Sequence, residues 1–323
     1  MIRLAVMTSG GDAPGMNAAL RAVVRMALST GYDIVGIPHG FSGLIAGEFR
    51  PLNARDVGGI IGVGGTLLGT TRCAALKTPA GLQAAVAALK KHDINGLIVI
   101  GGNGSQAGAY ALSRSGVPVI GIASTIDNDL PGTDISIGVT TALDVAVEAI
   151  DRLRVTAASL RRVFLVEVMG NRSGYLALMA GLASGAEAIV VPEVKFGPEA
   201  LMHHLHRLYD QGRSHAIVVV AEGATYNADQ IHDFFTSHPG LASFETRVTK
   251  LGHIQRGGTP GVFDRLLATR LGAAAIEQVT QGHWGNLVGL VNGEIATTEL
   301  KLVNTTEKRL STDMLNLAKA LAC

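Results

Sequence analysis

Residues 4–17 read Leu-Ala-Val-Met-Thr-Ser-Gly-Gly-Asp-Ala-Pro-Gly-Met-Asn, in which a short apolar run is followed by a glycine-rich loop. The run Leu4–Met7 predicts a buried strand, and the amphipathic stretch Met16–Ser29 predicts the helix that follows. A helix start offers free backbone N–H groups, so the glycines between strand and helix favour close approach of a phosphate. A plain helix cap is the alternative. The loop is neither a Walker A loop nor a Rossmann fingerprint, because the residues that define those motifs are absent.

The same alternation of apolar runs and helical stretches continues along the chain. Further predicted strands are Ile34–Ile37, Leu97–Ile100, Val119–Ile122, Val163–Val168, Ala188–Val191 and Ala216–Ala221. Further predicted helices are Gln106–Ser113, Thr140–Arg154, Tyr175–Ser184, Leu201–Gln211 and Asp264–Thr280. Strands that alternate with helices are typical of parallel sheets covered on both faces. We therefore expect an α/β protein with two doubly wound lobes, mainly parallel sheets and an active site in the cleft between the lobes.

The boundary between the lobes is expected near Gly138. The first lobe would comprise residues 1–138, together with a C-terminal segment of about residues 256–305 that crosses back to it. Residues 139–255 would form the second lobe, and residues 306–323 a C-terminal helix.

Composition excludes several classes of protein. With 323 residues, 47% hydrophobic and 16% charged, the chain is expected to fold around a core. The net charge of +1 provides no global basic field for nucleic acid or a membrane surface. The apolar runs are too short to span a bilayer, and the start reads as a strand and not as a signal peptide. The two cysteines argue against a disulfide framework, so a cytoplasmic location is expected.

Four predicted strands end in residues suited to chemistry. In open parallel sheets ligands bind beyond the carboxyl ends of strands, so these four ends are expected to meet at one cleft. The segment Gly101–Ser105 is interpreted as a second phosphate cradle, with Ser105 as a simple helix cap the alternative. The other ends are Gly10-Gly11-Asp12, Ser124–Asp129 and Glu222-Gly223.

The loop Thr125-Ile126-Asp127-Asn128-Asp129 carries two carboxylates two positions apart. On an extended loop we expect them to face opposite sides, one toward a hydroxyl and the other toward a metal. Phosphoryl transfer needs that division, with an acceptor for the substrate proton and a ligand for Mg²⁺. A polar turn is the alternative.

Basic residues suggest an anion site. His253 and Arg256 stand three apart in Leu251–Gly258, with Arg247 upstream and Arg162 at the start of another predicted strand. Arginines gathered at one cleft of a near-neutral protein would hold a dianionic ligand. The alternative is that each is a solvated surface residue.

Together these motifs resemble bacterial ATP-dependent 6-phosphofructokinase, the phosphofructokinase A family. The resemblance runs from about Leu4 to about Gly289 and includes Gly10–Ala18, Thr125–Asp129, Glu148–Arg152, Val166–Gly170 and Gly252–Gly258. It implies a glycolytic enzyme that phosphorylates D-fructose 6-phosphate at O1 with ATP and Mg²⁺, giving fructose 1,6-bisphosphate and ADP. It also implies a nucleotide-binding first lobe and a sugar-phosphate-binding second lobe. A homotetramer with shared active sites follows, because in this family Arg162 and Arg247 reach a neighbouring subunit's site.

The resemblance also assigns roles to residues. Asp127 would be the general base, assisted in catalysis by Thr125 and Arg72, and Asp129 would support Mg²⁺, with Asn103 a weak second ligand. ATP would contact Gly11, Arg72, Cys73, Gly102, Asn103, Gly104 and Ser105. The sugar phosphate would contact Thr125, Asp127, Arg162, Met169, Gly170, Asn171, Glu222, Arg247, His253 and Arg256. An effector site for ADP or phosphoenolpyruvate would comprise Arg21, Arg25, Arg154, Gly185, Glu187, Arg213 and His215.

Two departures from the family pattern concern the donor. Asn103 replaces an aspartate that helps to bind Mg²⁺, so metal affinity should fall. Ala123-Ser124 replaces the usual Pro-Gly, whereas pyrophosphate-using relatives tend to have lysine at position 124 and aspartate at position 104. Gly104 leaves room for the α-phosphate and Ser124 brings no cation, so ATP is favoured over pyrophosphate.

Two further departures concern the sugar and the effector. Asn171-Arg172 stands where an arginine usually follows Met169-Gly170, so the positive charge has moved by one residue. The effector arginine expected near residue 54 appears as Arg55, and Gln211 replaces a basic residue, which puts effector control in doubt.

Three functions therefore stay open at this stage. ATP-dependent phosphorylation of fructose 6-phosphate is the first. The second keeps the chemistry but uses another ketose phosphate, or pyrophosphate as the donor. The third is a weakly active regulatory subunit that binds sugar phosphate, supported by Asn103 and Arg172.

Overall fold

A computed structural model describes residues 2–195, 197–238 and 244–321. It divides into two compact units. Unit 1 comprises residues 1–141 and 256–308, and unit 2 comprises residues 142–255 and 309–323. The chain thus passes between the units three times, after Thr141, Gln255 and Lys308.

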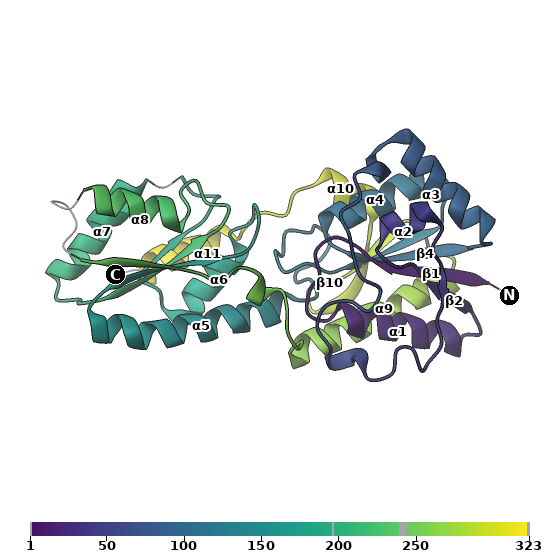
Figure 1. Cartoon of the computed structure of the whole chain (residues 1–323), viewed down its shortest axis with the longest axis horizontal. Helices are drawn as coiled ribbons and strands as arrows, with labels where there is room; N and C mark the ends of the chain where they lie inside the picture. The colour runs from purple at the N-terminus through teal and green to yellow at the C-terminus, as the bar shows by residue number, and fades with distance from the viewer. Residues whose placement is uncertain (1, 196, 239–243, 322–323) are drawn as a thin grey trace. The chain divides into compact units, whose positions relative to one another are not determined.

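A seven-stranded sheet forms the centre of unit 1, in the order β11-β10-β5-β4-β1-β2-β3 (Figure 1). The five inner strands pair in parallel, and the edge strands β3 and β11 pair antiparallel. Every residue of β4 is buried, as expected for a central strand covered on both faces. The strands are β1 (Arg3–Thr8), β2 (Asp33–Gly36), β3 (Arg50–Pro51), β4 (Gly96–Gly101), β5 (Val119–Ala123), β10 (Asn286–Val291) and β11 (Glu294–Glu299).

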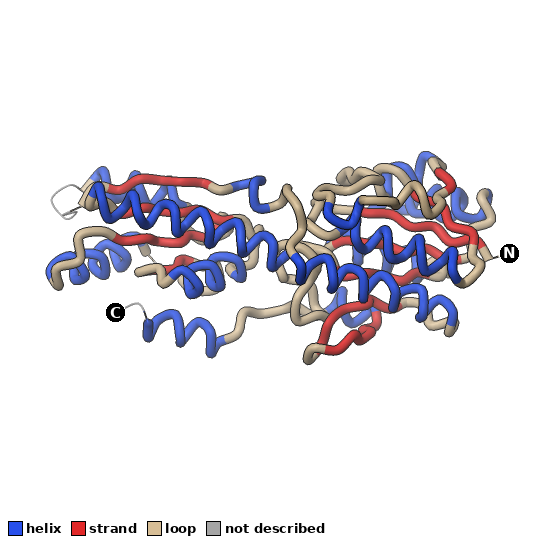
Figure 2. Tube along the Cα trace, turned by 90° about the horizontal axis from the view of Figure 1, so that it is seen from below, coloured by secondary structure: helices blue, strands red, loops and turns tan. Residues whose placement is uncertain are grey.

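Helices cover both faces of this sheet, and Figure 1 shows the strands lying between them; Figure 2, seen from below, shows helices of the near face in front of the strands. α1 (Met16–Ser29) and α9 (Val262–Thr280) pack together on one face. The other face buries alternate strand residues such as Ala5 and Met7 beneath the remaining helices. Those helices are α2 (Phe41–Ala46), α3 (Pro79–Lys91), α4 (Asn103–Arg114) and α10 (Leu300–Thr305).

Unit 2 contains a four-stranded sheet that is parallel throughout, in the order β7-β8-β6-β9. α7 (Pro198–Asp210) and α8 (Ala228–Ser237) bury their apolar side chains on one face. Figure 1 shows α5 (Val139–Leu160) on the opposite side of the sheet, and α11 (Thr312–Leu321) packs against α6 (Tyr175–Ser184). The strands are β6 (Val163–Val168), β7 (Ala188–Val190), β8 (Ala216–Ala221) and β9 (Thr246–Lys250).

The predicted fold class, an α/β protein with two mainly parallel sheets, is confirmed. Several helix boundaries were predicted too short, since α5 continues to Leu160 and α9 begins at Val262. The alternative that Ser105 caps α4 is wrong. The N-cap residue is Gly102, which has no side chain to accept a hydrogen bond, and Ser105 lies within the first turn of the helix.

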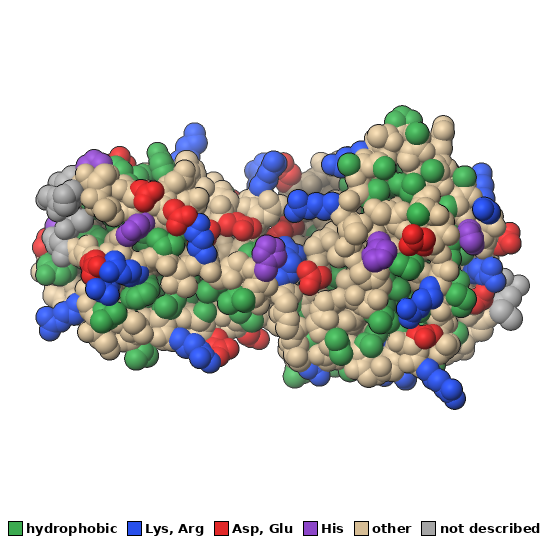
Figure 3. All heavy atoms as spheres, in the orientation of Figure 1, with side chains coloured by type: hydrophobic (Ala, Val, Ile, Leu, Met, Phe, Trp, Pro, Cys, Tyr) green, Lys and Arg blue, Asp and Glu red, His purple; other side chains and the backbone are tan. Residues whose placement is uncertain are grey.

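The surface fits the composition. Figure 3 shows lysine and arginine interspersed with aspartate and glutamate on the face in view. None of the described helices combines the length and the apolar character that crossing a bilayer requires.

Asp264, on α9, is fully buried and holds the start of α5. One carboxylate oxygen accepts the backbone N–H of Gly138 at 2.8 Å. The other accepts the backbone N–H of Thr141 at 2.8 Å and the hydroxyls of Thr140 and Thr141 at 2.7 and 2.6 Å. A carboxylate beside a helix N-terminus is favoured by the helix dipole, so Asp264 acts as a cap supplied by another element.

We expect Asp264→Asn to destabilise the protein by roughly 2–4 kcal/mol, because an amide nitrogen would replace an acceptor among four donors. Urea unfolding monitored by circular dichroism measures the change. The matched control is Asp144→Asn, an exposed carboxylate on α5, which should leave the transition where it is. Equal unfolding midpoints for the two variants would contradict this role of Asp264.

Candidate active site

The first glycine loop joins β1 to α1 and lies beside the second one. Gly10 and Gly15 have φ angles of 85° and 109°, which favour glycine over other residues. The backbone N–H of Ser9 donates to the carbonyl of Ile100, at the end of β4, at 3.0 Å. A Cβ on Gly10 would lie 3.1 Å from the Oγ of Ser105. The two predicted phosphate cradles are therefore neighbours within unit 1.

Asn17 secures a third segment against this loop. Its side-chain amide is almost fully buried, donates to the carbonyl of Val63 at 3.0 Å and accepts the N–H of Leu67 at 2.7 Å. Further along the segment, the hydroxyl of Thr70 donates to the carbonyl of Gly10 at 2.7 Å. These bonds place the exposed Arg72 two residues beyond a direct contact with the glycine loop. Sequence reasoning included Asn17 in the motif but missed this role.

Cys73, next to Arg72, is partly buried and packs against the core, with a free thiol. Arg72 is thus exposed, whereas Cys73 holds the segment against the core. The packing accounts for a small apolar residue at this position.

Thr125 packs against the second cradle. The N–H of Ser124 donates to the carbonyl of Gly101 at 3.2 Å, and a Cβ on Gly102 would lie 3.1 Å from that of Thr125. In the described part of the chain, the buried hydroxyls of Ser105 and Ser124 have no hydrogen-bond partner. Buried polar groups are normally paired, so these two hydroxyls are exceptions to that rule.

The loop around Asp127 was predicted to be extended, with its two carboxylates facing opposite sides. The prediction of an extended loop was wrong. Asn128, between them, has a left-handed φ of 48°, and the chain bends at Ile126 and Asp127. Asparagine tolerates this region because its side chain can bond to nearby backbone. Asp127 is only 9% exposed, and its N–H donates to the Thr125 hydroxyl oxygen at 3.2 Å.

Asp129 is partly buried beside Asn103 and Lys308. The side-chain nitrogen of Asn103 donates to the Asp129 carbonyl at 3.2 Å. Burial raises the pKa of the Asp129 carboxyl above its usual range, while a hydrogen bond from Asn103 and the charge of Lys308 oppose the rise. Burial lowers the pKa of Lys308 to about 8, against the opposing charges of Asp134 and Asp129. Nothing in the sequence pattern around Lys308 pointed to this position.

Arg256 lies on the first glycine loop of unit 1. Its Nη1 donates to the carbonyl of Asp12 at 2.9 Å, and a Cβ on Gly11 would lie only 2.2 Å from that nitrogen. The resemblance assigned Arg256 to the sugar phosphate, whereas in this structure its guanidinium covers the loop assigned to ATP.

In unit 2, the ends of β6 and β8 bring four predicted sugar-binding residues together. Glu222 accepts the backbone N–H groups of Gly170 and Asn171 at 3.2 and 2.8 Å. The N–H of Met169 donates to the Oε1 of Gln255 at 2.9 Å. Asn171 has a left-handed φ of 54°, so the position belongs to a tight turn and not to a strand.

The remaining predicted phosphate ligands of unit 2 do not join this cluster. Arg162 pairs with Glu245 at 2.5 Å, and Arg247 pairs with the same carboxylate. His253 is exposed on the short helix Gly252–Gln255. The two arginines thus lie together, Arg162 just before β6 and Arg247 on the adjacent strand β9, held by one glutamate.

Four of the predicted effector residues meet around Glu187. Its Oε1 lies 3.4 Å from a guanidinium nitrogen of both Arg154 and Arg213. Arg154 also donates to the carbonyls of Ser184 and Gly185 at 2.7 and 3.1 Å. The other two predicted arginines, Arg21 and Arg25, lie on α1 in unit 1.

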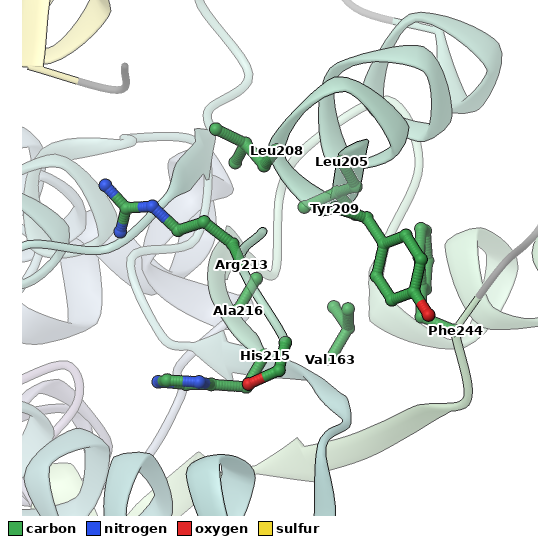
Figure 4. A pocket seen from close by; sticks show the side chains of 9 residues that line it. Val163, Leu205, Leu208, Tyr209, Arg213, His215, Ala216 and Phe244 are labelled. Carbon is green, nitrogen blue, oxygen red and sulfur yellow. The ribbon is translucent and has the colours of Figure 1, made fainter. Parts of the chain in front are cut away.

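Arg213 and His215 also line a small open hollow in unit 2. Figure 4 shows that the guanidinium of Arg213 and the ring of His215 extend away from Tyr209 and Phe244. The rest of the lining is mostly aliphatic and aromatic, so the hollow is largely apolar. Its lining comprises Val163, Leu205, Leu208, Tyr209, Arg213, Ser214, His215, Ala216 and Phe244.

Comparison with known proteins decides the family. The phosphofructokinase family model matches residues 3–279. The chain belongs to the phosphofructokinase family. It is 45% identical to the ATP-dependent 6-phosphofructokinase of Bacillus cytotoxicus and 46% identical to that of Halalkalibacterium halodurans, each over 322 residues and the full length of both chains. The family predicted from the motifs is thereby confirmed.

A solved relative shows the same fold in a longer chain. Pichia pastoris phosphofructokinase in the T-state superimposes with a TM-score of 0.88 and 32% identity. The match covers 99% of this phosphofructokinase-family chain but only 36% of the Pichia chain. The chain therefore spans about a third of that relative's length.

We expect Gly11→Ala and Arg256→Ala each to raise the KM for ATP, and their effects to be less than additive in the double variant. The added methyl would displace the guanidinium from Asp12, so both changes remove one contact. Initial rates at saturating fructose 6-phosphate measure the three KM values. Fully additive effects would show that Arg256 does not act through the first glycine loop.

Proposed function

We propose that this chain transfers the terminal phosphoryl group of ATP to O1 of D-fructose 6-phosphate, giving fructose 1,6-bisphosphate and ADP. Its full-length relatives at 44–46% identity are ATP-dependent 6-phosphofructokinases. The observation that carries the proposal is the juxtaposition, in unit 1, of two glycine cradles and the Asp127 loop. Phosphoryl transfer depends on such positioning, with donor phosphates held against a base.

Asp127 is proposed as the general base. It would accept the proton of the O1 hydroxyl as that oxygen bonds to the γ-phosphorus and the bond to ADP breaks. Thr125, packed on Gly102, would hold the transferring group between base and nucleotide. Arg72 would offset the charge that develops on the phosphoryl oxygens.

Mg²⁺ is the proposed metal, with Asp129 as its protein ligand and Asn103 as a weaker one. Among the residues described, no group of three or more His, Cys, Asp and Glu side chains could enclose a metal ion. This fits Mg²⁺, which is usually held by one or two carboxylates together with substrate phosphates. The ion would neutralise phosphate oxygens when it arrives with the nucleotide.

ATP is proposed as the donor in preference to pyrophosphate. A Cβ on Gly104 would meet no atom within 4 Å, so the position opens onto space that an α-phosphate could use. Ser124 contributes a buried hydroxyl and no cation. The nucleotide would therefore contact Gly11, Arg72, Cys73, Gly102, Asn103, Gly104 and Ser105.

The sugar is proposed to bind Met169, Gly170, Asn171 and Glu222, with its 6-phosphate on Arg162, Arg247 and His253. Arg256 would join them only by leaving the carbonyl of Asp12, to which it donates on the first glycine loop. A homotetramer with shared sites would supply Arg162 and Arg247 from a neighbouring copy. The cluster around Glu187 is the proposed place for ADP or phosphoenolpyruvate. A glycolytic role would place the enzyme in the cytosol.

We expect Asp127→Ser to lower kcat by several orders of magnitude with little change in the KM for fructose 6-phosphate, because a transition-state role is removed. A coupled assay for fructose 1,6-bisphosphate measures both constants. The control is Asp313→Ser, an exposed carboxylate on α11. Near-normal turnover of Asp127→Ser would refute its assignment as base.

The same assay, run with wild type, separates the alternatives. Turnover with pyrophosphate exceeding that with ATP would overturn the proposed donor. Negligible turnover with both donors at all Mg²⁺ concentrations, alongside tight fructose 6-phosphate binding, would favour the regulatory subunit.

We expect Asn103→Asp to lower the Mg²⁺ concentration for half-maximal rate by about tenfold, since a second charged ligand is typically stabilising by 1–3 kcal/mol. Without Mg²⁺ the variant should be slightly less stable, because aspartate cannot donate to the Asp129 carbonyl. A Mg²⁺ titration at fixed ATP tests this, with the exposed Asn316→Asp as control. An unchanged Mg²⁺ midpoint would remove position 103 from the metal site.

A further inference from the structure

Lys308 makes contacts that its position in the sequence does not suggest. It lies three residues beyond the end of α10 and is the last residue of unit 1. Its side chain is partly buried. The ammonium donates to the Oδ1 of Asn128 at 3.0 Å and to the carbonyl of Asp134 at 2.8 Å.

Both acceptors belong to the structure that shapes the Asp127 loop. The Asn128 amide nitrogen donates to that same Asp134 carbonyl at 3.0 Å, so Asn128, Asp134 and Lys308 form a closed set of hydrogen bonds. Ser136 adds its N–H to Asn128 Oδ1 at 3.2 Å and its hydroxyl to the Thr125 carbonyl at 2.7 Å. The loop is therefore braced from behind by side chains and not only by its own backbone.

The brace is itself fixed to the sheet. The N–H of Asp134 donates to the carbonyl of Leu290, in β10, at 2.6 Å, and the N–H of Leu290 donates to the hydroxyl of Thr133 at 3.0 Å. Lys308 thus connects the left-handed turn at Asn128 to a segment that is hydrogen-bonded to β10.

The partial burial of the Lys308 ammonium has an energetic cost that its contacts must offset. Surface lysines usually keep their ammonium in water, and partial burial is costly unless hydrogen bonds and opposite charges compensate. Here Asp129 and Asp134 supply the opposite charges. The two hydrogen bonds and these two carboxylates therefore compensate for the partial burial of the ammonium.

We propose that Lys308 is a positioning residue for phosphoryl transfer. It holds the turn at Asn128 and thereby fixes where Asp127 and Asp129 lie. The inference rests on the proposed role of Asp127 as base. A misplacement of about 1 Å in a reacting group can cost on the order of a hundredfold in rate, so a looser turn should reduce kcat more than substrate affinity.

The test compares Lys308→Met, which removes both hydrogen bonds, with Lys308→Arg, which keeps the charge and N–H donors. Lys301→Met, an exposed lysine on α10, is the matched control. We expect Lys308→Met to lower kcat by about 10- to 100-fold with the KM for fructose 6-phosphate within about twofold of wild type. Lys308→Arg should be intermediate, and Lys301→Met should be unchanged.

Hydrogen exchange of residues 125–136 supplies a second readout. In Lys308→Met this segment should exchange faster, while the rest of unit 1 stays protected. A kcat within twofold of wild type would overturn the inference, as would a kcat loss with unchanged exchange in that segment. If Asp127→Ser keeps its activity, the proposed base fails. If only Lys308→Met keeps its activity, the positioning role alone fails.

Discussion

The parallel pairing of β1, β4 and β5 is the constraint on which the candidate site depends. Thr8 pairs with Ile100, and Gly101 pairs with Ala123, so three strands end at the same level. Each is followed by a segment that leaves the sheet, the first glycine loop, the second cradle and the Asp127 loop. Because the ladder fixes their register, these segments need few contacts of their own to stay close. The glycines then remove side chains where the loops approach one another.

Much of this arrangement could be predicted from the sequence, because strands and helices have characteristic local patterns of apolar residues. Short apolar runs, most of them followed by amphipathic stretches, identify β1, β2, β4 and β5 of unit 1, the strands β6, β7 and β8 of unit 2 and about half of the helices, but the inner strand β10 was not predicted. Long-range contacts have no such pattern. Asn17 reaches a segment some fifty residues away, and Lys308 reaches a turn far earlier in the chain. The edge strand β11 alternates too weakly in burial to stand out.

Two of the departures from the family pattern acquire a physical meaning in the structure. Asn103 donates to the Asp129 carbonyl, a bond that aspartate cannot make, so the lost charge is partly exchanged for a hydrogen bond. Asn171 occupies a left-handed turn, a conformation that suits asparagine better than a long side chain. Nothing in the described structure explains the exchange of the usual arginine for Arg172 one residue later.

All three chain crossings begin or end beside a hydrogen bond within unit 1, and two of these bonds lie at the candidate site. Thr141 is held by Asp264, Arg256 by the carbonyl of Asp12 in the first glycine loop, and Lys308 by Asn128. Unit 2 is covalently linked to unit 1 only through these crossings. The second and third crossings are therefore bonded directly to the first glycine loop and to the turn that follows Asp127. A residue at a chain crossing thus helps to hold a loop of the candidate site, although it lies far from that loop in the sequence.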